Sequence, residues 1–119
     1  MRDCRDLEVW QKSMVLVKQA YLLCATLPKE EIYGLVSQIR RAAVSILANI
    51  AEGAERNGTG AFIQFLGVAR GSAAELETLL LLTGEVGVAP PEATLLLRDQ
   101  LASVRRMLSA LMRSLRLKR

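Results

Sequence analysis

The sequence predicts an all-α protein, an antiparallel up-and-down four-helix bundle, and three observations favour this fold. Apolar residues make up 51% of the chain but aromatic residues only 4%, so the apolar content is mostly Leu, Ala, Val and Ile. Leu and Ala are strong helix formers, and only three prolines interrupt them. Apolar residues also recur every three or four positions along four segments with short connections, which is the helical period. The 119 residues have the length of a single domain, residues 1–119.

The first segment predicts a helix from about Asp6 to Leu27, with Asp6 as its N-cap and Pro28 ending it. A cap side chain accepts a hydrogen bond from a free backbone N–H of the first turn. Steps of three and four residues define a heptad stripe, which should face a neighbouring helix. The residues of this stripe are Leu7, Trp10, Met14, Val17, Tyr21 and Cys24.

The second helix should run from about Leu35 to Glu52, and Gly53 is a natural C-terminal cap because glycine tolerates a left-handed backbone. Asn49 falls next to the buried stripe of this helix, where a buried amide often fixes the register of packing. The alternative is that Asn49 lines a central opening. The stripe consists of Leu35, Ile39, Ala42, Ile46 and Ile50, with Ala43 and Val44 widening it.

The polar, glycine-containing stretch 54–60 predicts a loop, and Thr59 is placed to cap a third helix. Gly67 and Gly71, four residues apart, would allow another helix to approach this one closely. Gly84 and Gly87 should end the helix. Its predicted stripe is Phe62, Leu66, Ala69, Ala73, Leu76, Leu80 and Thr83.

The fourth helix should begin at Pro90 and Pro91, because proline fits the first positions of a helix. Its apolar residues repeat at intervals of four and three without a break. They are Leu97, Leu101, Val104, Leu108, Leu111 and Leu115.

Charge is unevenly distributed along a chain whose net charge is +4. The stretch 61–97 holds one cation, Arg70, and four glutamates, whereas the stretch 98–119 holds seven cations and one anion, Asp99. The basic end of the chain either contacts an acidic partner such as nucleic acid, or keeps the last helix soluble and complements its dipole. Arg40 and Arg41 lie in the middle of the second helix, where one of them could pair with Glu75 or Glu77.

The residues needed for enzymatic chemistry are largely missing, so we expect no catalytic activity. The chain contains no histidine, which excludes Ser-His-Asp and Cys-His catalysis and most imidazole-based metal sites. Cys4 and Cys24 sit at opposite ends of one predicted helix, too far apart to form a disulfide within the chain. Glu75 and Glu77 are two residues apart and point to different sides of a helix. We therefore expect no catalytic site, cofactor or metal.

No stretch of the sequence predicts a membrane span or a secretory signal. The stretch from Ala42 to Ala51 reaches about half of the ~20 apolar residues that a spanning helix needs. The N-terminal residues carry mixed charge and lack the apolar centre of a signal peptide. The sequence therefore predicts a cytoplasmic protein without membrane contact.

Five segments together resemble a known family: DLEVWQK (6–12), YGLVSQIRRAAVSI (33–46), NIAEG (49–53), FIQFL (62–66) and GSAAELET (71–78). The chain resembles the bacterial four-helix bundle proteins first noticed as reading frames in intervening sequences of 23S ribosomal RNA genes. The match covers nearly the whole chain, and it is specific only as a combination.

The resemblance implies a cytoplasmic bundle that assembles into a homopentameric ring. It also implies kinship to the accessory variability protein of diversity-generating retroelements, a basic pentamer that binds a reverse transcriptase and nucleic acid. Relatives often carry several Arg or Lys before the third helix, but this chain has Arg56-Asn-Gly-Thr-Gly60 there. Any nucleic-acid contact would therefore fall to other arginines, namely Arg40, Arg41, Arg105, Arg106, Arg113 and Arg116.

Two classes of function follow from these observations. The protein is either an oligomeric subunit that binds RNA or DNA through phosphate contacts, or a protein-binding scaffold whose basic surface serves solubility. In both cases we expect a homo-oligomer, since the bundle has more apolar residues than one core can bury. The residues expected to stay exposed for assembly are Leu79, Leu81, Leu82, Leu95 and Leu96.

Overall fold

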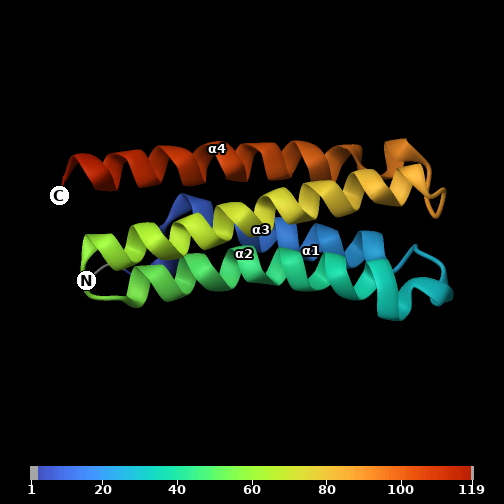
Figure 1. Cartoon of the computed structure of the whole chain (residues 1–119), viewed down its shortest axis with the longest axis horizontal. Coiled ribbons are helices and arrows are strands. Elements are labelled where there is room, and N and C mark those ends of the chain that lie inside the picture. Colours follow the sequence, from blue (N-terminus) through green and yellow to red (C-terminus); the bar gives the residue numbers. More distant parts are fainter. Residues whose placement is uncertain (1–2, 119) are drawn as a thin grey trace.

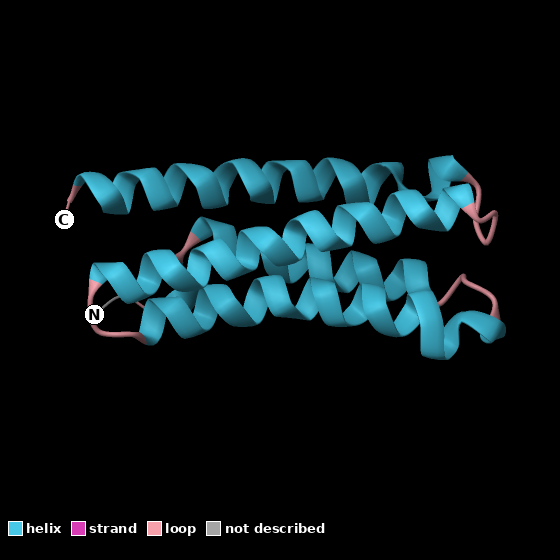
Figure 2. Cartoon of the chain, viewed as in Figure 1, coloured by secondary structure: helices cyan, strands magenta, loops and turns pink. Residues whose placement is uncertain are grey.

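The computed structural model describes residues 3–118, and these form four long helices that run antiparallel. Helix α3 lies between α2 and α4, with α1 behind them (Figure 1). In the described part of the chain, helices are joined by loops and there is no strand (Figure 2). The predicted all-α four-helix bundle is thus confirmed. The helices are α1 (Glu8–Cys24), α2 (Ser37–Glu55), α3 (Thr59–Glu85) and α4 (Leu95–Leu117).

The buried stripe of α1 differs from the predicted one by about one position. Ser13, Leu16 and Ala20 are fully buried, whereas the predicted Trp10 is only half-buried and Tyr21 is 43% exposed. Both stripes have the same helical period, so periodicity alone does not distinguish them. The stripe with smaller side chains, Ser13 and Ala20, faces the other helices. The one with larger side chains lies at the edge of the bundle.

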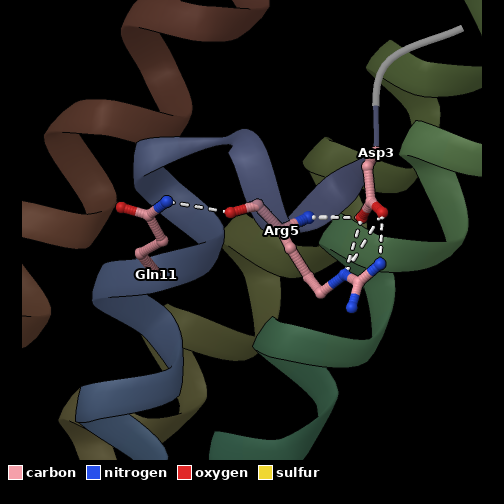
Figure 3. A network of polar contacts seen from close by, with 3 residues as sticks. All are labelled: Asp3, Arg5 and Gln11. Atoms are coloured by element: carbon pink, nitrogen blue, oxygen red, sulfur yellow. Dashed lines mark hydrogen bonds and ion pairs between the residues drawn. The ribbon is translucent and has the colours of Figure 1, made fainter.

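The chain enters α1 through a short helical turn, η1 (Cys4–Asp6), and the predicted N-cap is wrong. Helix α1 begins at Glu8 after Leu7, so Asp6 does not cap it. Instead, the Asp3 carboxylate accepts hydrogen bonds from the backbone N–H of Arg5 at 2.9 Å and from its guanidinium at 2.6 Å. The side-chain amide of Gln11 donates to the carbonyl oxygen of Arg5 at 2.8 Å, which ties this turn to α1 (Figure 3).

The hydrogen bonds from Arg5 lower the pKa of Asp3 from 3.8 to about 2. Because the folded-state pKa is depressed, the contact contributes to stability at pH values above 3.8. That contribution is lost as the pH falls toward about 2. The Asp3 carboxylate therefore stays ionised, and bonded to Arg5, throughout the neutral and mildly acidic range.

The connection from α1 to α2 contains the turns η2 (Lys29–Glu31) and η3 (Ile32–Val36). The Glu31 carboxylate accepts a hydrogen bond from the backbone N–H of Leu35 at 3.2 Å, while Gly34 has non-helical backbone angles (φ −108°, ψ −110°). Leu35 and Val36 are buried by this turn, but Tyr33 is 96% exposed.

The predicted stripe of α2 is confirmed, since Ile39, Ile46 and Ile50 are fully buried; Val44, however, is 40% exposed. Asn49 is half-buried and donates to the carbonyl oxygen of Ser45 at 2.8 Å. The hydroxyls of Ser45 and Ser72 lie 2.8 Å apart and link α2 to α3. The amide nitrogen of Asn49 therefore donates within this polar link, to the carbonyl and the hydroxyl of Ser45.

Gly53 does not cap α2, because the helix continues to Glu55. A Cβ at position 53 would lie 2.8 Å from Cβ of Phe65 and 2.9 Å from Cδ1 of Phe62. Gly53 therefore allows α3 to pack closely against α2. In the loop that follows α2, Gly58 adopts a positive φ of 101°, and α3 begins at Thr59 without the predicted side-chain cap.

We expect Gly53→Ala to lower the free energy of unfolding by about 1–3 kcal/mol, because the added methyl group overlaps two phenylalanines. Gly71→Ala is the matched control, since a Cβ at this exposed helical position meets nothing within 4 Å. Alanine should stabilise the helix there by about 0.5–1 kcal/mol. Urea denaturation at one protein concentration measures both, and equal effects would contradict the close packing at Gly53.

Of the two glycines predicted to end α3, Gly87 does so and Gly84 does not. Gly87 adopts a positive φ of 77° and its N–H donates to Gly84, while the N–H of Val88 donates to Thr83 at 3.2 Å. This pair of hydrogen bonds is a Schellman motif, which satisfies the last carbonyl groups of the helix. Pro91 then opens the turn η4 (Pro91–Thr94), which leads directly into α4. Gly84 itself lies inside α3.

The stripe of α4 forms its side of the core. Leu97, Leu101, Val104 and Leu108 are at most 4% exposed, while Leu111 and Leu115 are half-buried against the core. Since the arginines of α4 share this helix, the packing of the leucines fixes the direction in which each arginine points.

Candidate nucleic-acid interface

Five arginines lie on one side of α4. At about 100° per residue, Arg98, Arg105 and Arg116 fall on one line along the helix and Arg106 and Arg113 on the adjacent line. The two lines cover roughly a third of the helix circumference. Arg106, Arg113 and Arg116 are exposed, whereas Arg98 and Arg105 are half-buried. The sequence thus concentrates cations on one side of α4, and we call these five arginines the α4 arginine surface.

Arg105 already has a partner within the bundle. Its guanidinium lies 2.5 Å from the carboxylate of Glu77 on α3, and both side chains are partly exposed. An ion pair at the surface contributes little to stability, typically 0–1 kcal/mol. It does, however, offset one of the five positive charges. Arg105 stays a predicted phosphate contact, but Glu77 competes for it.

Arg70, which is not among the predicted nucleic-acid contacts, extends the surface onto α3. Its guanidinium donates to the hydroxyl of Ser109 at 3.5 Å, and Ser109 lies on α4 between the two lines of arginines. No local pattern predicts this neighbour, because only the packing of α3 against α4 brings positions 70 and 109 together.

Arg40 and Arg41 lie apart from the α4 arginine surface, and within residues 3–118 neither forms an ion pair with Glu75 or Glu77. The Arg40 guanidinium lies over the ring of Tyr21 at 4.9 Å, a cation–π contact between α2 and α1. Its Nε atom is buried and has no partner in the described residues. Arg40 therefore has a role in packing, which makes it a weaker candidate for phosphate binding.

Arg41 is exposed and points into a polar groove between α2 and α3. Its guanidinium donates to the hydroxyl of Ser37 at 3.3 Å. The groove has a volume of about 350 Å³. Its lining residues are Tyr33, Ser37, Gln38, Arg41, Ala42, Ser45 and Glu75.

The described residues contain no group of three or more His, Cys, Asp or Glu side chains that could hold a metal ion. Cys24 is buried, and desolvation raises the pKa of its thiol. A raised pKa keeps the thiol neutral and unreactive near pH 7. None of the helices within the described residues has the length and apolar character needed to cross a bilayer.

These features define a four-helix bundle with a basic side and a polar groove. The model of the 23S rRNA-intervening sequence protein family matches residues 5–110, and the chain belongs to this family. A search of curated proteins finds no match.

One solved structure confirms the fold. It is the crystal structure of a protein with unknown function from the S23 ribosomal protein family of Bacteroides thetaiotaomicron. That protein is 24% identical, with a TM-score of 0.81 over 87% of this chain and 97% of its own. At this level of identity the likeness concerns the fold alone.

Proposed function

We propose that the protein is a non-enzymatic, self-associating bundle that binds nucleic acid through phosphate contacts of the α4 arginine surface. The observation that carries the proposal is the position of Arg106, Arg113 and Arg116, which are exposed on one side of α4. Within residues 3–118, none of these three arginines has a carboxylate oxygen within 4 Å of its guanidinium. Arginines of this kind neutralise phosphates without reading base edges.

The chain offers little for sequence-specific recognition. It has only five aromatic residues, which is few for an extended stacking platform. The family membership does not supply a mechanism, because the described relative is itself of unknown function. Binding should therefore be largely independent of sequence and steeply dependent on salt. A filter-binding titration with RNA and DNA at two salt concentrations tests the proposal.

The alternative is a protein-binding scaffold that does not bind nucleic acid. The exposed leucines Leu81, Leu82, Leu95 and Leu96 support it, since each is 42–60% exposed. Of the predicted assembly residues, Leu79 is an exception: it faces the core and is only 6% exposed. If the parent protein shows no salt-sensitive binding to RNA or DNA, the scaffold function is the better conclusion. A reverse transcriptase is then one protein partner to test.

Self-association is part of both functions, and we expect light scattering at micromolar concentration to give about five times the chain mass of 13.1 kDa. Leu96 is 60% exposed and lines a groove with Leu22 of α1, which is 62% exposed. Exposed apolar surface of this kind usually marks an interface. Replacing Leu82 and Leu96 by Gln should lower the mass, whereas Leu117→Gln, at the exposed end of α4, should not. A parent mass of 13.1 kDa would reject the assembly.

A further inference from the structure

A polar groove lies between α2 and α3, outside the bundle core. One wall is formed by Ser37, Gln38 and Arg41 at the start of α2, and the opposite wall includes Glu75 of α3. Tyr33, from the turn η3, stands at its edge. With about 350 Å³, the groove has the volume of a small-molecule site and can hold a group the size of a nucleobase.

Tyr33 is the most accessible aromatic residue of the bundle, with 96% of its surface exposed. An aromatic ring that packs against nothing contributes little to folding. It can instead offer its face to a planar ligand. Aromatic side chains stack on the unpaired bases of single-stranded nucleic acid, and this stacking tolerates any base.

The charges of the groove favour a definite orientation of a bound nucleotide. Arg41 has a single hydrogen bond, to Ser37 at 3.3 Å, and no carboxylate of residues 3–118 lies within 4 Å of it. Its remaining N–H donors are therefore available to a phosphate. Glu75, on the opposite wall, is an acceptor that repels phosphate but can accept N–H groups of a neutral base. The base should lie inside the groove and its phosphate at Arg41.

The groove and the α4 arginine surface lie on opposite flanks of the exposed face of α3. Glu77 and Arg70 face α4, while Glu75 faces α2. The exposed residues between them on the helix include Gly71, Ala74 and Thr78, which are small and uncharged. A strand that crosses α3 here bridges about 10 Å, the diameter of a helix, without passing over a buried charge.

We propose that the groove binds an unpaired base of single-stranded nucleic acid, stacked on Tyr33 with its phosphate at Arg41. The proposal rests on the proposed nucleic-acid function and adds a preference for single strands to it. A base that is paired in a duplex is stacked between its neighbours, so it cannot enter the groove.

Three probes of equal length and charge per strand test this: a single-stranded RNA, an abasic single strand, and the RNA annealed to its complement. Tyr33→Ala should weaken binding of the single-stranded RNA by about tenfold. The same substitution should leave the abasic strand and the duplex within about twofold. Tyr33→Phe is the matched control, because it keeps the ring and should bind like the parent.

The outcomes separate this proposal from the proposed function. If the parent binds all three probes with salt dependence but Tyr33→Ala equals Tyr33→Phe, only the groove proposal is overturned. It is also overturned if Tyr33→Ala changes the mass in light scattering, because Tyr33 would then be a contact between subunits. If the parent binds none of the probes, both proposals fail.

Discussion

Leu108→Ala and Leu101→Ala should each lower the free energy of unfolding by about 2–5 kcal/mol. Both side chains are at most 1% exposed and lie in the centre of the α4 stripe. Removing three carbon atoms loses their transfer free energy and leaves a cavity that the surrounding helices fill only in part. Against a total stability of about 5–15 kcal/mol, either loss is large.

Urea denaturation measures the effect, and all variants must be compared at one protein concentration because assembly also stabilises the fold. Leu117→Ala is the control on the same helix, since Leu117 is 83% exposed and its truncation should cost less than about 0.5 kcal/mol. A loss of under half a kcal/mol for Leu108→Ala would show that the stripe is not part of the core.

The sequence predicted the number, order and direction of the helices because their apolar period is regular and their connections are short. The α4 stripe was predicted correctly from Leu97 to Leu108. Beyond it, the predicted Leu111 and Leu115 are half-buried, whereas Met112, which was not predicted, is only 3% exposed. In α1 the apolar period predicted the wrong stripe. Trp10, Val17 and Tyr21 form one apolar stripe and Leu16 and Ala20 belong to another, so the period cannot tell which one faces the core.

The role of a glycine was also predicted wrongly. Gly53 was predicted to end α2, but it is a contact between α2 and α3 whose reason, the position of Phe65, is more than ten residues away. Local patterns describe backbone conformation and contain no information on such distant neighbours. For the same reason, the sequence located the arginines of α4 but not the partner of Arg105. It also did not show that Arg70 joins them.

Replacing Arg106, Arg113 and Arg116 together by Gln should weaken binding of RNA and DNA alike. The three side chains are exposed, and Gln is nearly as good a helix former as Arg, so the helix should persist. Each phosphate contact to a single strand contributes about 0.7 to the slope of log K against log salt. Losing three contacts should flatten that slope by about 2 and lower the affinity about a hundredfold at 0.1 M salt.

Arg105 is left in place in this variant, because substituting it would leave Glu77 without its partner and mix a change in packing with a change in charge. The control removes the same number of charges from exposed positions elsewhere, by Lys12→Gln, Lys18→Gln and Lys29→Gln. If binding were due to net charge alone, both variants would lose affinity equally. A large loss only for the arginine variant, with unchanged mass in light scattering, would place the phosphates along α4. Unchanged affinity in both variants would move the contacts to Arg41 and its groove.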